Sequence, residues 1–125
     1  MPKTILLIED NEDIRENTAE LLELEGFRVL AVQNGQDGIA LTRTDLPDLV
    51  ICDILMPEMD GYAVFRRLLS QEETRHIPFI FFTARSESVD KAKADAIGRC
   101  SYLIKPFDET ELLALIARVL NGRAE

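Results

Sequence analysis

Residues able to do acid, metal and phosphoryl chemistry stand directly after short apolar runs of this sequence. There are five of them: Glu9, Asp10, Asp53, Thr83 and Lys105. Together they supply three carboxylates, one hydroxyl group and one ammonium group. Such a set can bind a cation and stabilise a phosphoryl group, provided that the fold brings its members to one place.

The chemistry of this set follows from its charges. Three neighbouring carboxylates repel one another and favour protonation unless a cation offsets their charge. Carboxylate ligands without a nearby His or Cys favour a hard ion, and an open site that retains water suits Mg²⁺ better than Ca²⁺. One carboxylate could then attack phosphorus to give an aspartyl phosphate. Lys105 and the cation would neutralise the phosphoryl oxygens, and the Thr83 hydroxyl could donate a hydrogen bond to them.

The elements that must position these residues alternate regularly along the chain. Short apolar runs predict strands over 3–8, 27–32, 49–52, 79–82 and 102–104. Segments with apolar residues at helical spacing predict helices over 13–25, 36–42, 62–70, 86–97 and 108–120. Continuously apolar strands are typical of a parallel sheet that is covered on both faces.

This alternation predicts an α/β fold with three layers: a doubly wound, flavodoxin-like sheet of five parallel strands in the order 2-1-3-4-5. The whole chain, 1–125, is predicted to form a single domain. In such sheets the binding crevice lies beyond the carboxyl ends of the strands. The five candidate residues all follow strand ends, so the fold predicts that they converge there.

Composition and charge exclude several classes of function. The formal net charge is −9, from 14 Lys and Arg against 23 Asp and Glu, and Arg66-Arg67 is the longest basic run. This balance argues against direct nucleic-acid binding. No apolar run is long enough for a signal peptide or a membrane span. The two cysteines, Cys52 and Cys100, lack metal-ligand spacing and predict buried, reduced thiols, which favours a cytoplasmic location.

The sequence resembles the response-regulator receiver domains of two-component signalling, which have the fold of the chemotaxis regulators. The resemblance runs from about Lys3 to Leu120, and it rests on motifs in a fixed order. These are Ile8-Glu9-Asp10-Asn11, Asp53-Ile54-Leu55-Met56-Pro57-Glu58-Met59-Asp60-Gly61, Phe82-Thr83-Ala84 and Tyr102-Leu103-Ile104-Lys105-Pro106-Phe107.

The resemblance implies that Asp53 is the phosphoacceptor and receives its phosphoryl group from a histidine kinase or a histidine phosphotransfer protein. It implies that Asp10, Asp53 and the backbone carbonyl of Leu55 bind Mg²⁺, with Glu9 acting mainly through a water molecule. Lys105 is then expected to pair with the phosphoryl group. The resemblance also implies that the domain is not an enzyme with a separate substrate and that it catalyses only its own phosphorylation and dephosphorylation.

The resemblance also implies a conformational switch. The Thr83 hydroxyl moves to the phosphoryl group and the Tyr102 ring turns inward, while a cis peptide bond before Pro106 aims the preceding lysine at the site. The switched surface is formed by the fourth helix, the fifth strand and the fifth helix, and it controls a downstream effector or an output domain outside this sequence.

Phosphorylation could also drive homodimer formation. In the dimerising transcription factors of this family an Arg stands where this chain has Leu115. Lys91 and Glu111 could still form one ion pair across such a dimer, but the full set is incomplete. Leu115 is therefore expected on a different partner surface.

Particular residues argue against several other functions. A haloacid-dehalogenase-type phosphatase needs a second Asp two positions after the first, where this chain has Leu55. A flavin binder on the same topology would not place four carboxylates at 9–13, and an EF-hand would need a central Gly there. A pseudo-receiver that binds partners without phosphorylation remains an alternative. The sequence also leaves open whether the domain acts alone or is part of a larger regulator.

Overall fold

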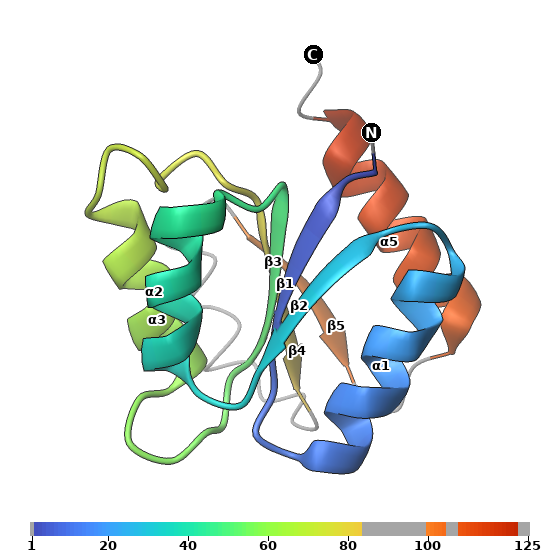
Figure 1. Cartoon of the computed structure of the whole chain (residues 1–125), viewed down its shortest axis with the longest axis horizontal. Coiled ribbons are helices and arrows are strands. Elements are labelled where there is room, and N and C mark those ends of the chain that lie inside the picture. Colours follow the sequence, from blue (N-terminus) through green and yellow to red (C-terminus); the bar gives the residue numbers. More distant parts are fainter. Residues whose placement is uncertain (1, 84–99, 105–107, 123–125) are drawn as a thin grey trace.

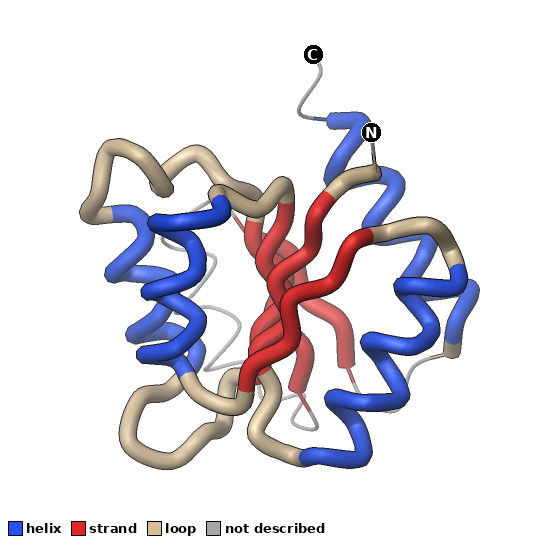
Figure 2. The backbone as a smooth tube through the Cα atoms, viewed as in Figure 1, coloured by secondary structure: helices blue, strands red, loops and turns tan. Residues whose placement is uncertain are grey.

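The chain forms a five-stranded, fully parallel sheet in the order β2-β1-β3-β4-β5, as predicted. The computed structural model describes residues 2–83, 100–104 and 108–122. The strands are β1 (Thr4–Ile8), β2 (Arg28–Val32), β3 (Leu49–Asp53), β4 (Phe79–Thr83) and β5 (Cys100–Ile104). In Figures 1 and 2 the sheet runs through the centre of the molecule with helices on both sides.

Four helices are described: α1 (Glu12–Leu24), α2 (Gly35–Asp45), α3 (Gly61–Leu69) and α5 (Glu109–Gly122). In Figure 1, α2 and α3 cover one face of the sheet, and α1 and α5 cover the other. This arrangement is the predicted doubly wound fold. The helix predicted over 86–97 lies outside the described residues.

Strand residues alternate between two apolar cores, one on each face of the sheet. In β1, Leu6 and Ile8 pack into the cluster under α2 and α3, whereas Ile5 and Leu7 pack into the cluster under α1 and α5. All four side chains are fully buried. The continuous apolar run therefore reflects two buried faces rather than one. Packing in these two cores fixes how far each strand extends along the sheet. It thereby fixes where the residues after each strand lie.

Two sequence signals fix the ends of α1. Asn11 caps the N-terminus, since its side-chain oxygen accepts a hydrogen bond from the Ile14 amide at 3.0 Å. At the other end Gly26 has a φ of 96° and donates to Glu23, and Phe27 donates to Leu22. This pair of bonds is the Schellman arrangement, which needs a residue that tolerates positive φ. The helix predicted over 13–25 thus ends within one residue of its expected end.

Helix α2 is longer than predicted at both ends. Asn34 is its N-cap and accepts a hydrogen bond from the Asp37 amide at 2.8 Å. The helix then continues to Asp45 rather than ending at Thr42. Leu46 ends it in a left-handed conformation with a φ of 43°, directly before Pro47. A leucine in this conformation gives no sequence signal, because such positions usually hold Gly or Asn.

Two further expectations need correction. Leu115 is only 5% exposed and packs in the core beside Leu112 and Ile116, so it does not belong to a partner surface. Of the two thiols, Cys52 is buried as predicted, but Cys100 is only partly buried. None of the described helices has the length and apolarity needed to cross a membrane.

Candidate functional site

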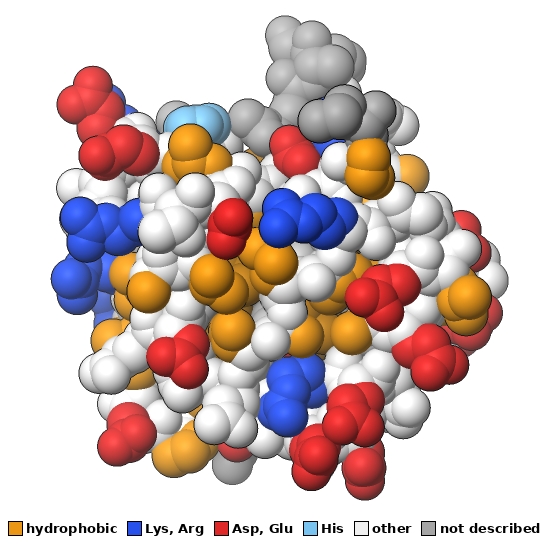
Figure 3. Space-filling model, viewed as in Figure 1, with side chains coloured by type: hydrophobic (Ala, Val, Ile, Leu, Met, Phe, Trp, Pro, Cys, Tyr) orange, Lys and Arg blue, Asp and Glu red, His pale blue; other side chains and the backbone are white. Residues whose placement is uncertain are grey.

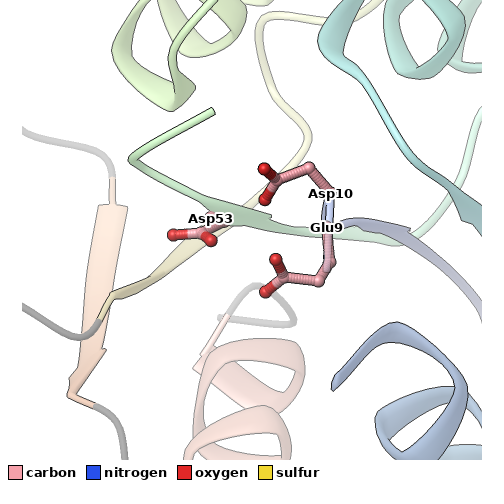
Figure 4. Close-up of side chains that lie close together, drawn as sticks. All are labelled: Glu9, Asp10 and Asp53. Atoms are coloured by element: carbon pink, nitrogen blue, oxygen red, sulfur yellow. The ribbon is translucent and has the colours of Figure 1, made fainter. Parts of the chain in front are cut away.

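Three carboxylates meet beyond the carboxyl ends of β1 and β3, at the lower edge of the sheet in Figure 1. Glu9 and Asp10 follow the last residue of β1, and Asp53 is the last residue of β3. These strands are neighbours, with Ile8 paired to Cys52. One oxygen from each carboxylate lies within 4.8 Å of the others. Figure 4 shows the three groups turned toward a common space.

The three side chains differ in their access to solvent. Glu9 is fully buried, Asp53 is 7% exposed, and Asp10 is exposed. The site is thus open to solvent on the side of Asp10. Removing a carboxylate from water is costly unless hydrogen bonds or positive charge compensate. The site holds oxygen ligands of the kind that hard divalent cations select, and a cation would offset the repulsion among them.

Glu9 is held by hydrogen bonds to both its side chain and its backbone. Its Oε2 accepts a bond from the Asn11 amide at 3.0 Å. Its backbone amide donates to the Val32 carbonyl at 3.0 Å, and its own carbonyl accepts from Nη1 of Arg15 at 2.9 Å. Residues of β2 and α1 therefore fix the segment that carries the first two carboxylates.

Asp53 is positioned by the turn that follows it. The Leu55 amide donates to Oδ1 of Asp53 at 3.3 Å, and the Gly61 amide donates to the Ile54 carbonyl at 2.9 Å. A Cβ atom on Gly61 would collide with the Asp53 carbonyl oxygen. Asp60 caps the following helix by accepting from the Ala63 amide at 2.9 Å. Glycine at 61 is thus required by the close approach of the α3 N-terminus to the backbone of Asp53.

Burial and these carboxylates raise the pKa of a neighbouring thiol, that of Cys52. Burial raises the pKa of Cys52 well above its usual range, and the charges of Asp53 and Glu9 raise it further. Asp60 makes a smaller contribution in the same direction. The thiol donates a hydrogen bond to the Asp53 carbonyl at 3.2 Å. Cys52 packs in the apolar core under α2 and α3, and the clustered ligand atoms are all carboxylate oxygens.

Of the other predicted site residues, Thr83 and Tyr102 belong to the described strands, whereas Lys105 and Pro106 do not. Thr83 ends β4 and pairs with Ile104 of β5, at the same sheet edge as Asp53. Tyr102 is half-buried in β5, with its ring centre 5.6 Å from that of Phe81. Lys105 and Pro106, with the predicted cis bond, lie outside the described residues.

Sequence reasoning assigned no role to three residues that shape the site: Asn11 and Gly61, which it named only as motif members, and Arg15. Asn followed by two acidic residues is an N-cap signal that could have revealed the first. Gly61 could have been questioned because it stands where a helix begins. Arg15 carries no signal, because an arginine in the first turns of a helix is usually solvent-exposed.

Comparisons with known proteins match the sequence and the fold of this chain. The family model of the response regulator receiver domain matches residues 5–117. Protein PilH of Pseudomonas aeruginosa is 39% identical over 118 residues, which cover 94% of this chain and 98% of PilH. The phosphate regulon transcriptional regulatory protein PhoB of the same species is 37% identical over 119 residues, covering 95% of this chain but 52% of PhoB. The chain thus spans about half the length of this regulator.

Among solved structures, the receiver domain of the sensor histidine kinase PA1611 of Pseudomonas aeruginosa has a TM-score of 0.88 to this chain. The two are 30% identical, and the match covers 97% of this chain and 99% of that domain. That structure is described as holding a magnesium ion in its active-site cleft. The family model covers nearly all residues of both apolar cores as well as the three clustered carboxylates. This chain therefore belongs to the response regulator receiver domains.

Proposed function

We propose that this receiver domain accepts a phosphoryl group on Asp53, with Mg²⁺ bound by the neighbouring carboxylates, and thereby switches a downstream partner. The observation that carries the proposal is the convergence of Glu9, Asp10 and Asp53, two of them buried, at the carboxyl edge of a parallel sheet. A cluster of buried acids is costly for stability and is retained where it serves a site.

The ligand chemistry supports Mg²⁺ as the cation. Among the residues that the structure describes, this cluster contains carboxylates and no imidazole or thiolate. Asp10 and Asp53 are assigned as direct ligands, together with the backbone carbonyl of Leu55, and Glu9 as an indirect one. The solved receiver domain of PA1611 is described with a magnesium ion in its active-site cleft, which supports Mg²⁺ as the cation. When bound, the ion would supply positive charge to the oxygens of the transferring phosphoryl group.

The transfer step itself belongs to Asp53. One carboxylate oxygen forms a bond to phosphorus as the bond between phosphorus and the donor nitrogen breaks, and the leaving imidazole keeps the electron pair. The Leu55 amide, which bonds to Oδ1, orients the carboxylate for this attack. Lys105 is assigned to the phosphoryl oxygens as a second positive charge. The donor is a phosphohistidine of a histidine kinase or a phosphotransfer protein.

The output is a shift between two conformations. A phosphoryl group adds close to two negative charges, which favour the state in which Thr83 and Lys105 contact it. Tyr102, half-buried beside Phe81, is positioned to turn further inward when the threonine moves. The surface of β5, α5 and the helix predicted over 86–97 would then bind an effector or an output domain. The two free cysteines fit action in the reducing cytoplasm.

Phosphorylation with a small-molecule donor tests the proposal. The full chain is incubated with acetyl phosphate and Mg²⁺, and its intact mass is measured. We expect the mass of one phosphoryl group to be added, and we expect neither a chelator-treated sample nor Asp53→Asn to gain it.

A matched control is Asp45→Asn. Asp45 is an exposed carboxylate at the last residue of α2, at the opposite edge of the sheet. This variant should be phosphorylated like the wild type. Equal labelling of Asp53→Asn and wild type would contradict the proposal, and the absence of labelling in the wild type would favour a receiver that binds partners without phosphorylation.

A further inference from the structure

An arginine from α1 reaches back to the segment that carries the first two acids. Arg15 is half-buried, and its Nη1 donates a hydrogen bond of 2.9 Å to the backbone carbonyl of Glu9. The side chain also lines a hollow of about 250 Å³ with Val32, Gln33 and Asp37, between α1 and the segment after β2. The guanidinium thus lies between the N-terminal turn of α1 and the end of β1.

The helix itself gains little from an arginine at this place. Arg15 is the fourth residue of α1, near the positive end of the helix dipole, where negative side chains such as Glu12 and Asp13 are favoured. Helix stability therefore does not explain an arginine at this position. The effect of its hydrogen bond on the Glu9–Asp10 peptide does.

The bond restrains the peptide group between Glu9 and Asp10. A peptide group is planar, so fixing the Glu9 carbonyl oxygen fixes the plane that also contains the Cα atom of Asp10. The Glu9 amide is already held by the Val32 carbonyl at 3.0 Å. The orientation of this plane sets the direction in which the Cα–Cβ bond of Asp10 leaves the chain.

We propose that Arg15 is a positioning residue for the cation site: it clamps the peptide between Glu9 and Asp10 so that the Asp10 carboxylate faces Asp53. This inference rests on the proposed Mg²⁺ site. It assigns to Arg15 no contact with the ion or with the phosphoryl group. Residues that orient metal ligands from outside the coordination sphere typically change metal affinity by ten- to a hundredfold when they are replaced.

Charge and geometry make opposite predictions for the loss of Arg15, and this difference makes the inference testable. A positive guanidinium beside a cation site repels the cation, so an effect of charge alone would tighten Mg²⁺ binding when the arginine is removed. Loss of the clamp would weaken binding because Asp10 is no longer held toward Asp53. The sign of the change in affinity separates the two effects.

The experiment compares Mg²⁺ dissociation constants by isothermal titration calorimetry of the full chain. Arg15→Met is compared with wild type and with Arg43→Met, which removes the same charge from an exposed position in the last turn of α2. We expect Arg15→Met to bind Mg²⁺ about tenfold more weakly than wild type. Arg43→Met should match the wild type. An affinity of Arg15→Met that is unchanged or tighter overturns the clamp.

Two further measurements keep the outcome decisive. Thermal unfolding with a chelator present shows whether Arg15→Met is folded at the titration temperature. If it is not, Arg15→Lys replaces it, since lysine keeps the charge but lacks the planar fork of donors. Its dissociation constant should then rise by roughly threefold, less than the ten- to hundredfold range above, because lysine can still donate one hydrogen bond to the Glu9 carbonyl. A value at or below that of wild type overturns the clamp. If the wild type itself binds no Mg²⁺, the proposed function fails as well, whereas equal binding by wild type and Arg15 variants removes the clamp alone.

Discussion

At the scale of single residues, the acceptor site depends on one position where a side chain has no room. A Cβ atom at Gly61 would lie 3.0 Å from the Ile54 Cα and would collide with the Asp53 carbonyl oxygen. Gly61→Ala must therefore move the backbone of the acceptor. We expect a loss of about 1–3 kcal/mol in the free energy of unfolding, measured with urea, and weaker Mg²⁺ binding.

Gly26→Ala is the matched control for this prediction. Gly26 has a φ of 96° and open space around its Cβ position, at the far end of α1 from the site. Alanine there is strained by backbone conformation alone and should cost about 1 kcal/mol. Its Mg²⁺ affinity should equal that of wild type. If both variants, or neither, lose Mg²⁺ affinity, Gly61 has no special relation to the acceptor.

A second prediction at this scale concerns pH. The pKa of the Cys52 thiol is raised above its ordinary value of 9.0 by burial and by the nearby carboxylates. Between that value and the higher folded-state pKa, the unfolded chain releases a proton that the folded chain retains. Stability must therefore fall with rising pH above about pH 9, by up to about 1.4 kcal/mol per pH unit from this group.

Urea unfolding of wild type and Cys52→Ala between pH 8 and 10.5 measures this contribution. The alanine variant is less stable throughout because it leaves a small cavity, but its stability should fall less steeply above pH 9. Cys100→Ala, at a partly buried position, is the control and should keep the wild-type slope. Parallel curves for wild type and Cys52→Ala would show that the thiol does not titrate differently on folding.

At the scale of elements, α2 approaches β1 closely through a glycine. A Cβ atom at Gly38 would lie 2.9 Å from Cγ1 of Ile8 and still closer to its Cδ1. Gly38→Ala should cost about 1–3 kcal/mol of stability through overpacking, despite the better helix propensity of alanine. Ile8→Val removes the colliding Cδ1 atom.

A double-mutant cycle tests this contact. If Ile8 causes the cost, Gly38→Ala should be less harmful in the Ile8→Val background, with a favourable coupling of about 0.5–2 kcal/mol from urea unfolding. Additive losses would mean that the alanine meets another obstacle. Ile8 is the last residue of β1 and immediately precedes Glu9. The same contact therefore helps to fix the position of Glu9 and Asp10 at the carboxyl edge of the sheet.

The sequence predicted the elements that have a strong local signal. Apolar runs predicted four of the strands within one residue of their ends, and helical spacing predicted α1 with the same accuracy. The strand expected over 102–104 begins earlier, at Cys100, because its first two residues are only partly buried and lack the apolar signal. The end of α2 at Leu46 was missed because a leucine rarely adopts positive φ.

At the scale of the whole molecule, the arrangement of the acids could be predicted because topology determines it. A parallel sheet places all carboxyl ends at one edge, so Glu9, Asp10 and Asp53 had to meet. Of the residues that hold them, Asn11 carries an N-cap signal, but the contacts of Arg15 and Gly61 could not be predicted. The hydrogen bond from Arg15 to Glu9 and the lack of space at Gly61 depend on the angle between elements, which hydrophobic periodicity does not encode.

Metal removal is the corresponding prediction for the whole chain. The chain carries a net charge of −9, and three of its acids lie together, so Mg²⁺ should bind the folded state and not the unfolded one. At a hundred times its dissociation constant, the ion should add about 2.7 kcal/mol to stability. Thermal unfolding with Mg²⁺ and with a chelator measures this gain. Asp53→Asn should lose most of it, whereas Asp45→Asn should retain it.

The central claim is spatial: carboxylates from β1 and β3 surround one ion beside the acceptor. A crystal structure of the full chain grown with Mn²⁺ in place of Mg²⁺, with the ion located by anomalous scattering, tests it most directly. We expect one strong peak with Asp10 and Asp53 oxygens among its ligands and Glu9 in the surrounding shell. A fully occupied ion elsewhere, or an acidic edge that stays empty at saturating metal, would contradict the account.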